Sequence, residues 1–319
     1  MNKKSKIYIA GHKGLAGSAL VRKLEAEGYS NLITQSHGAL DLTRQSEVET
    51  FFQEENPEYV FLAAAKVGGI LANNTYPAEF IFNNLIIQTN VIHAAWKSGV
   101  NRLLFMGSSC IYPRECPQPM KEEYLLTGPL EKTNEPYAIA KIAGIKMCQS
   151  YNRQYGTKIM AVMPTNLYGP NDNFDPETSH ALPAMIRKFH EAKSVKSSVE
   201  IWGTGNPRRE FLHVDDLSDA CIFLINLEDK IYNPLLTACD SPIINIGYGK
   251  DISIKELSFL MKDIIGFEGE IVFDLTKPDG TPQKLLEVSR TSELGWEPKI
   301  SLKNGIHKTY DWCLKNSVF

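Results

Sequence analysis

The chain has 319 residues, of which 43% are hydrophobic and 22% are charged, with a formal net charge of −3 and a pI near 6.2. This length allows one substantial domain and one smaller domain, and the weakly acidic balance argues against binding to nucleic acid or to an acidic membrane surface. No stretch reaches the roughly 18 apolar residues of a membrane-spanning helix and no signal peptide is recognised, so we expect a cytoplasmic protein.

The cysteine pattern indicates neither a disulfide framework nor a zinc site. Six cysteines are spread along the chain without a CxxC pair or a His/Cys cluster, which suits a reducing cytosol, and we expect no metal. They are Cys110, Cys116, Cys148, Cys221, Cys239 and Cys313.

The first elements predict a dinucleotide site. Residues 7–10 are a short apolar run, typical of a strand buried in a parallel sheet, and a helical pattern begins after residue 14. Glycines between a strand and a helix allow a tight turn, a close backbone approach to a pyrophosphate and tight helix packing. We therefore expect the loop to bind the cofactor, rather than to be only a structural turn, through Gly11, His12, Lys13, Gly14, Leu15, Ala16 and Gly17.

The second predicted strand, residues 31–34, bears on the choice of cofactor. It ends without the carboxylate that binds the ribose in NAD sites. Lys13 and His37 can instead receive a 2′-phosphate, which favours NADP, and Asp41 and Leu42 are expected to lie against the adenine. The alternatives are a solvated surface lysine and a loop histidine without a ligand.

Strands and helices continue to alternate, with helices expected at 45–55 and 83–97 and strands at 59–65 and 102–106. This order predicts an α/β fold with a doubly wound parallel sheet, a Rossmann domain, whose ligands collect at the carboxyl ends of the strands. We expect this domain to span 1–170, with segments at about 211–247 returning to it, and a smaller substrate lobe to span 171–319. The small residues Ala63 and Ala64 would let a flat cofactor approach.

A tyrosine lies four residues before a lysine in the stretch 134–141, NEPYAIAK. This spacing places Tyr137 and Lys141 on one helix face, where the ammonium is expected to lower the pKa of the Tyr137 phenol so that it exchanges protons near neutral pH. Ser108, at the end of the strand 102–106, would donate a second hydrogen bond to the same substrate oxygen. Alone, such a pair is more often a packed ring beside a solvated charge; with the glycine loop and Ser108 it indicates a carbonyl-reducing site.

These motifs resemble those of the extended short-chain dehydrogenase/reductases, which act mostly on nucleotide sugars. The resemblance covers essentially the whole chain, in the blocks GHKGLAGSA, LAAAKVGGILANNTYPAEF, GSSCIYP, NEPYAIAKIAGIKMC, MPTNLYGPNDNF, SHALPA, REFLHVDD and KPDGTPQKLL. Within this family, the chain most resembles the members that epimerise GDP-4-keto-6-deoxy-D-mannose at C3 and C5 and reduce C4 with NADPH, giving GDP-L-fucose. The sequence departs from the family pattern in two places. The glycine loop has Leu15-Ala16 between its last glycines, and Lys13 and His37 stand where arginines are common.

The resemblance implies roles for Cys110 and His180 as the base and the acid of epimerisation. Inverting a carbon next to a ketone requires removing a proton from one face and returning one to the other, and these two groups titrate near neutrality. A carboxylate usually stands near the serine in relatives that dehydrate sugars, so Cys110 disfavours dehydration. For isolated residues, a buried small hydrophobe and a helix-start histidine beside the cap Ser179 would be the ordinary interpretations.

The remaining predicted contacts are divided between cofactor and substrate. Further cofactor contacts are Met106, Gly107, Ser108, Ser109, Tyr137, Lys141, Pro164, Thr165, Asn166, Leu167 and His180. The substrate contacts are Ser108, Cys110 and Asn166, together with Lys188, Trp202, Arg209, Asp279 and Lys284 for the diphosphate, base and sugar. Resemblance also implies a homodimer through the helices at 83–97 and 137–155. The alternatives are an enzyme for another GDP-4-keto sugar and a non-catalytic nucleotide-binding regulator.

Overall fold

A parallel sheet of six strands forms the centre of the computed structural model, which describes residues 1–175, 178–237, 242–277 and 279–319. Its strand order is β2-β1-β3-β4-β5-β9, and every neighbouring pair is parallel. The strands are β1 (Ile7–Ala10), β2 (Leu32–Ile33), β3 (Tyr59–Leu62), β4 (Arg102–Met106), β5 (Ile159–Pro164) and β9 (Ile243–Ile246). The predicted doubly wound sheet is confirmed.

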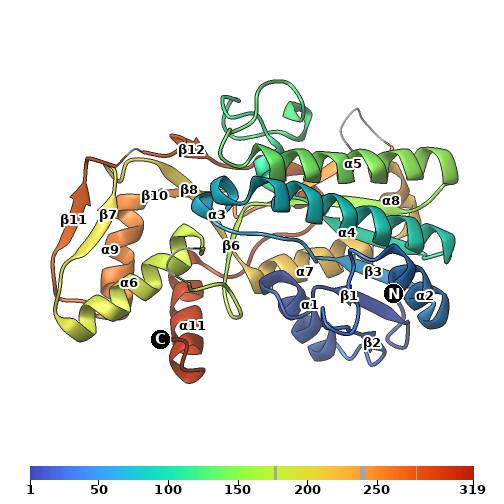
Figure 1. The fold of residues 1–319 in the computed structure, drawn as a ribbon, viewed down its shortest axis with the longest axis horizontal. Coiled ribbons are helices and arrows are strands. Elements are labelled where there is room, and N and C mark those ends of the chain that lie inside the picture. The colour runs from blue at the N-terminus through green and yellow to red at the C-terminus, as the bar shows by residue number, and fades with distance from the viewer. Residues whose placement is uncertain (176–177, 238–241, 278) are drawn as a thin grey trace.

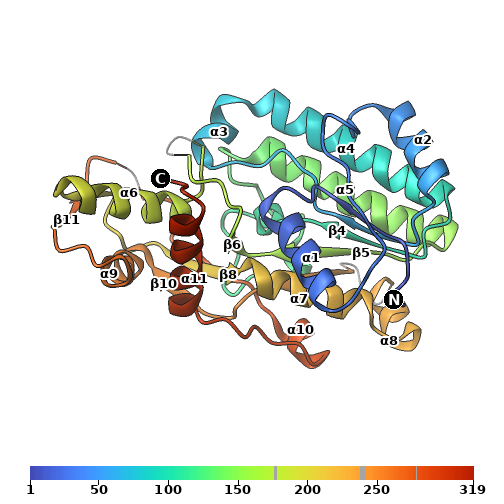
Figure 2. The same cartoon turned by 90° about the horizontal axis from the view of Figure 1, so that it is seen from below.

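Helices cover both faces of this sheet, as Figures 1 and 2 show. One layer holds α2 (Gln45–Glu55), α4 (Pro77–Lys97) and α5 (Glu135–Tyr155), and the other holds α1 (Leu15–Ala26) and α7 (Val214–Ile225), with α8 (Asp229–Leu235) beside them. Alternate residues of β1 enter the two cores: Tyr8 packs toward the first layer, and Ile7 and Ile9 toward the second. Apolar residues are needed on both faces, which is why these strands are continuous hydrophobic runs.

The chain order of the strands creates a crevice at the carboxyl edge of the sheet. From β1 the chain passes to β2 on one side, and then to β3 on the other side of β1. The loops that leave β1 and β3 therefore diverge, and parallel sheets bind ligands at such a switch point. The glycine loop follows β1, and Ala63 and Ala64 follow β3.

The second half builds a smaller lobe beside the carboxyl edge (Figure 1). Its core is formed by α6 (Ala181–Val195), α9 (Ile254–Ile265) and α11 (Leu302–Lys315), packed with β7 (Val199–Trp202) and its partner β11 (Ile271–Asp274). A second small sheet joins β6 (Asn166–Tyr168), β8 (Arg208–His213), β10 (Asp251–Ser253) and β12 (Gln283–Lys284). Because β8 runs directly into α7, this sheet connects the lobe to the nucleotide fold.

Several predicted boundaries differ from the structure. The long helix α4 begins at Pro77 rather than at residue 83, because proline suits the first turn of a helix, where its missing N–H has no partner to lose. A short helix, α3 (Ile70–Thr75), precedes it. Strand β3 ends at Leu62, so the small residues expected at its end lie in the following loop, facing the crevice. The remaining short elements are η1 (Ser109–Ile111), η2 (Glu122–Tyr124) and α10 (Ser289–Glu293).

Candidate active site

The glycine loop after β1 has the shape that a dinucleotide site requires. Gly11 has φ +87°, and a side chain there would lie 2.8 Å from the Ala64 backbone; a side chain at Gly17 would lie 2.1 Å from the Gly11 carbonyl oxygen. Gly14 differs, because its position is open apart from that oxygen at 3.5 Å, and it begins helix α1 without a side-chain cap. Two glycines thus close the packing, and the third leaves space and free amides for a phosphate group. The loop fits the predicted cofactor.

The residues expected around the adenosine lie on the rim of this crevice. Lys13 is exposed, and the His37 side chain is 85% exposed with its Nδ1 3.9 Å from the Asp41 carboxylate. Asp41 accepts hydrogen bonds from the Thr43 amide and hydroxyl, at 3.0 and 2.7 Å, which hold its pKa below the ordinary value. Arg44, which sequence reasoning missed, lies 3.7 Å from Asp41. Two cationic or titratable side chains, of His37 and Arg44, therefore lie beside this carboxylate, and Lys13 is exposed in the glycine loop.

Ser108 and Cys110 stand at the carboxyl end of β4. Ser108 is the N-cap of η1, and its Oγ accepts a hydrogen bond from the Cys110 amide at 3.2 Å. That bond uses an acceptor site of the hydroxyl and leaves its O–H free to donate. The Cys110 thiol is half-buried and accepts a hydrogen bond from Asn134 Nδ2 at 3.3 Å. Gly107, directly before Ser108, lets the chain pass close to β5, since a side chain there would meet Met163 at 2.4 Å.

Tyr137 and Lys141 lie on the first turns of α5, opposite this strand end. The Lys141 ammonium is buried, donates to the Met106 carbonyl at 2.8 Å and lies 5.8 Å from the Tyr137 ring centroid. Burial lowers the pKa of Lys141 to about 8. The expectation that this ammonium lowers the pKa of Tyr137 is wrong for this structure: burial raises that pKa, Cys110 raises it further, and a hydrogen bond with Ser108 opposes both. Burial is the largest of these causes, so the phenol is neutral and suited to donate a proton.

His180 lies at the start of the second lobe, beside a segment that contacts the loop of Gly68 and Gly69. It is the N-cap of α6, whereas Ser179, which we expected as the cap, donates its amide to Asp175 and belongs to the preceding turn. The His180 side chain is exposed to solvent, and the protein around it lowers its pKa by desolvation. Its neighbour Thr178 accepts the Gly69 amide at 2.9 Å, and a side chain at Gly69 would lie 2.5 Å from the Ser179 carbonyl.

The Gly68-Gly69 loop connects this segment to Tyr137. A side chain at Gly68 would lie 3.2 Å from the Phe80 ring of α4. Phe80 is buried, and its ring meets the Tyr137 ring edge-on at 6.3 Å between centroids. The segment before His180 is therefore linked to Tyr137 by contacts through the Gly68-Gly69 loop and Phe80 of α4.

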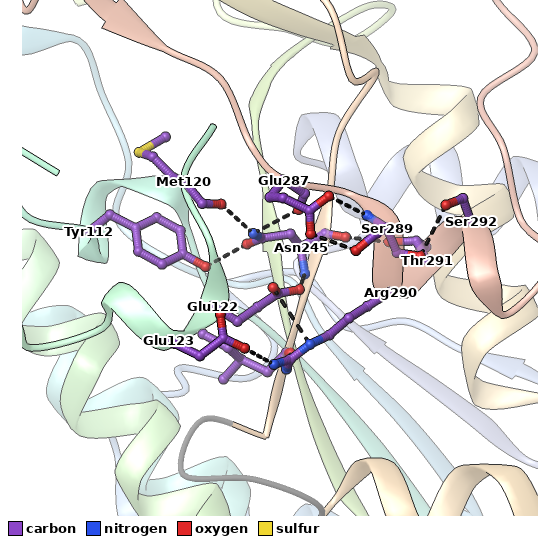
Figure 3. A network of polar contacts seen from close by, with 11 residues as sticks. Tyr112, Met120, Glu122, Glu123, Asn245, Glu287, Ser289, Arg290, Thr291 and Ser292 are labelled. Atoms are coloured by element: carbon purple, nitrogen blue, oxygen red, sulfur yellow. Dashed lines mark hydrogen bonds and ion pairs between the residues drawn. The ribbon is translucent and has the colours of Figure 1, made fainter. Parts of the chain in front are cut away.

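A polar network fixes the loop that follows Cys110, as Figure 3 shows. Tyr112 donates to Asn245 Oδ1 of β9 at 2.5 Å, and the backbone N–H of Asn245 donates to the buried Glu122 carboxylate at 3.1 Å. Arg290 lies 3.6 Å from that carboxylate, and Thr291 donates to the Asn245 carbonyl at 2.5 Å. The chain beside Cys110 is thus anchored to the edge of the main sheet and to the C-terminal region.

The predicted substrate residues of the second lobe lie in one neighbourhood. Asp279 accepts from the Thr204 amide and hydroxyl, at 2.9 and 2.7 Å, directly after Trp202-Gly203. Arg209 donates to the Thr281 carbonyl at 2.6 Å, and its guanidinium would lie 2.9 Å from a side chain at Gly280. Two further cations complete the group: Lys284 is the strand partner of Arg209, and Lys188 lies 5.9 Å from the Trp202 ring, which is 60% exposed. Lys277, 5.5 Å from that ring, was not predicted.

The connection between the lobes carries the remaining predicted contacts. Thr165 donates its amide to Ile246 of β9 at 3.0 Å, and Asn166 donates its side chain to the Glu210 carbonyl of β8 at 2.8 Å. This segment therefore stands between the main sheet and the lobe. Within the described ranges, no group of three His, Cys, Asp or Glu side chains could hold a metal ion, and no helix is long and apolar enough to cross a membrane. Cys239 lies outside the described residues.

The fold and the site define a dinucleotide-dependent enzyme that acts on a carbonyl group, and comparison with known proteins agrees. The family model of the NAD dependent epimerase/dehydratase family matches residues 7–247, and the chain belongs to this family. It is 58% identical to GDP-L-fucose synthase 1 of Arabidopsis thaliana over 99% of this chain and 95% of the relative, and 52% identical to GDP-L-fucose synthase of Escherichia coli over 98% of each. A GDP-mannoheptose C4 reductase from Campylobacter jejuni with NADP bound is 45% identical, covers 98% of this chain and 99% of its own, and superposes with a TM-score of 0.90.

Proposed function

We propose that this protein converts GDP-4-keto-6-deoxy-D-mannose to GDP-L-fucose by epimerisation at C3 and C5 followed by NADPH-dependent reduction at C4. The observation that carries the proposal is the joint presence of Ser108, Cys110, Tyr137 and Lys141 at one strand end, in a chain 52–58% identical over nearly its full length to named GDP-L-fucose synthases. A reductase alone would need only the serine, tyrosine and lysine.

Epimerisation is assigned to Cys110 and His180. The 4-keto group makes the protons on C3 and C5 acidic. The Cys110 thiolate removes one of them, leaving a negative charge on O4, and His180 returns a proton to the opposite face. Ser108 and Tyr137 stabilise that oxygen by donating hydrogen bonds, and the bond that Ser108 accepts from the backbone leaves its O–H able to donate.

Reduction is assigned to Tyr137, Ser108 and Lys141. When bound, NADPH supplies the hydride for C4. The neutral Tyr137 phenol then gives its proton to O4, while Ser108 holds the oxygen in place. Lys141 is placed to hold the nicotinamide ribose, and its bond to the Met106 carbonyl positions its amine. The 45% identity to a structure with NADP bound, together with Lys13, His37 and Arg44 around the crevice rim, supports NADP as the cofactor.

The second lobe, within residues 171–319, is proposed to bind the GDP part. Arg209 and Lys284 are adjacent across paired strands and would neutralise the diphosphate, with Lys188 near them. Trp202, exposed between two lysines, offers a ring on which a guanine can stack. Both oxygens of Asp279 already accept a hydrogen bond from Thr204, and its proposed role is to shape the loop beside the nucleotide.

A homodimer through α4 and α5 is part of the proposal. These helices pack together along their lengths, and their outer aromatic side chains include Tyr155, 43% exposed and stacked on Trp96 at 4.1 Å. Light scattering during gel filtration should give twice the mass of one chain, and a Tyr155→Glu variant should give the single mass. A cytoplasmic location is proposed on the free thiols of Cys110 and Cys116, since a reducing compartment preserves them.

The test follows two signals from one reaction in deuterated water. The wild-type protein should incorporate deuterium at C3 and C5 of the sugar and oxidise NADPH, with GDP-L-fucose as product. Tyr137→Phe should lose most NADPH oxidation and keep deuterium incorporation, whereas Cys110→Ser should lose incorporation. Loss of incorporation with intact reduction in Tyr137→Phe would contradict the assigned roles.

A second candidate is a C4 reductase for a GDP-heptose, because the GDP-mannoheptose C4 reductase shares 45% identity and the same fold. This candidate is disfavoured because the chain is more similar to the GDP-L-fucose synthases, at 52–58% identity. In addition, a simple reduction does not require an acid and a base such as His180 and Cys110. NADPH oxidation with a GDP-4-keto-heptose but not with the 6-deoxy sugar would favour this candidate.

A further inference from the structure

Asn134 begins helix α5 without capping it. Asparagine is among the residues preferred at this position, because its side-chain oxygen usually accepts a hydrogen bond from an amide of the first turn. Here Asn134 is the N-cap residue but makes no such bond. Its Nδ2 instead donates to the Cys110 sulfur at 3.3 Å, across 24 residues of sequence. The helix start forgoes a stabilising bond, and the amide is directed to the thiol.

The other end of this amide is also informative. Among the described residues, Asn134 Oδ1 is buried without a hydrogen-bond partner. A buried acceptor without a partner is costly, so the orientation needs a compensating interaction. A hydrogen bond from N–H to a negatively charged sulfur is strong enough to compensate, whereas one to a neutral thiol is weak. The orientation places an amide donor against a sulfur that accepts more strongly when it is charged.

The oxygen and the nitrogen of a side-chain amide occupy nearly the same space, so the Asn134 amide can also adopt the reversed orientation. When Cys110 carries a proton, the amide can reverse, and Oδ1 can accept the S–H. The side chain can therefore partner both forms of a sulfur that gains and loses a proton, which no lysine or glutamate could do without a net charge.

We propose that Asn134 is a positioning residue that stabilises Cys110 as a thiolate and, by reversing its amide, partners the thiol after proton removal. The inference rests on the proposed function. In that step the carbon–hydrogen bond of the sugar breaks, the sulfur–hydrogen bond forms, and the electron pair moves onto the substrate oxygen. Helix α5 packs against η1, and it also carries the neutral phenol of Tyr137, whose pKa is raised by burial and then by charge at Cys110, and the buried amine of Lys141. From this helix, Asn134 is the residue seen to donate a hydrogen bond to the sulfur.

Two substitutions test the proposal without removing the helix start. Asn134→Asp keeps the size but replaces the donor by an acceptor, and Asn134→Ser keeps a favourable N-cap residue that is too short to reach the sulfur. The first readout is alkylation of Cys110 by iodoacetamide, followed by peptide mass spectrometry, because the thiolate is the reacting form. Cys116, half-buried in the same chain, is the internal reference.

At pH 7.5, Asn134→Asp should slow alkylation of Cys110 about tenfold, which corresponds to about 1.4 kcal/mol, while Cys116 changes less than about twofold. The rate at high pH, where the thiol is fully ionised, should match that of wild type. The control is Gln118→Glu, the same amide-to-carboxylate change at a residue whose Nε2 makes a longer contact, 4.0 Å, with the Cys116 sulfur. This control should leave Cys110 alkylation unchanged.

The second readout separates this inference from the proposed function. Asn134→Asp should slow deuterium incorporation at C3 and C5 about tenfold or more. If wild type incorporates deuterium and both Asn134 variants match it in incorporation and alkylation, the inference is overturned. If wild type incorporates none, the proposed function fails, and the alkylation comparison still decides the role of Asn134. Should Asn134→Asp fail to fold, Asn134→Ser decides.

Discussion

Replacing Lys141 by methionine should remove catalysis and leave the fold intact, with a stability difference that depends on pH. The Lys141 side chain is 3% exposed, and burial lowers its pKa from 10.5 to about 8. At about 1.4 kcal/mol for each tenfold change in the acid constant, keeping this amine charged and buried costs about 3 kcal/mol. Methionine has a similar length and carries no charge, so it removes that cost.

A second effect acts in the opposite direction. Lys141 donates to the Met106 carbonyl at 2.8 Å, and methionine leaves this buried acceptor without its partner, at about 1 to 3 kcal/mol. At pH 7 we therefore expect the variant to be as stable as wild type or up to about 2 kcal/mol more stable. A neutral or stabilising change at a fully buried lysine is the expected sign of a residue retained for function.

The pH dependence separates the two effects. Because the folded pKa of Lys141 lies below the unfolded value, the folded state binds fewer protons between pH 8 and 10.5, so this amine makes wild type more stable as pH rises through that window. The advantage of the variant should accordingly shrink by about 2 kcal/mol between pH 7 and pH 9.5. Above that window, the missing hydrogen bond should make the variant the less stable protein.

The assay is guanidinium unfolding of the cofactor-free proteins at both pH values, followed by tryptophan fluorescence. Lys146→Met, on the same helix with its amine donating to Gln149, controls for helix propensity and added apolar surface. A Lys141→Met variant that is destabilised by several kcal/mol at pH 7, or whose difference from wild type is the same at both pH values, would refute this reasoning.

Three further perturbations probe the cofactor site and the second lobe. Gly17→Ala adds a methyl group 2.1 Å from the Gly11 oxygen, so NADPH affinity in a fluorescence titration should fall by about tenfold; an unchanged affinity would contradict the packing role. Lys13→Ala should lower kcat/KM for NADPH more than for NADH, and an unchanged ratio would remove Lys13 from phosphate binding. Burial raises the pKa of Asp172 from 3.8 to about 7, so its stabilising effect is lost as pH rises through that range. Asp172→Asn should therefore raise the melting temperature more at pH 8 than at pH 5; an equal rise at both would refute this.

Much of the nucleotide fold could be predicted because its signals are local. Strands β1 and β4 coincide with the predicted runs, since a strand buried on both faces must be apolar at every position. Helix α4 begins at Pro77, earlier than predicted, because its first turn lies in a polar and aromatic stretch without a clear period. In the second lobe, pairing of β6 with β8 and of β7 with β11 joins segments far apart in sequence, and no local pattern specifies such partners.

The candidate site divides in the same way. The spacing of Tyr137 and Lys141 predicts that they share a helix face, and the structure places both beside β4. Their electrostatics could not be predicted, because desolvation depends on everything that surrounds the ring. Asn134 was missed because an asparagine before a helix looks like an ordinary cap, and its contact with Cys110 exists only in three dimensions. Arg44 was missed because it lies seven residues beyond His37, past a loop of unpredictable shape.

The charge relation between Cys110 and Tyr137 suggests how one site can perform two reactions in order. Burial raises the pKa of Tyr137, and negative charge at Cys110 raises it further, so the phenol keeps its proton while the sulfur is the active base. Under the proposed roles, epimerisation leaves the sulfur protonated, which removes this smaller contribution to the raised pKa of Tyr137 while the contribution of burial remains. Tyr137 then becomes the stronger acid at the stage when O4 needs a proton. Protonation of Cys110 during epimerisation would thus make Tyr137 a better proton donor for the reduction that follows.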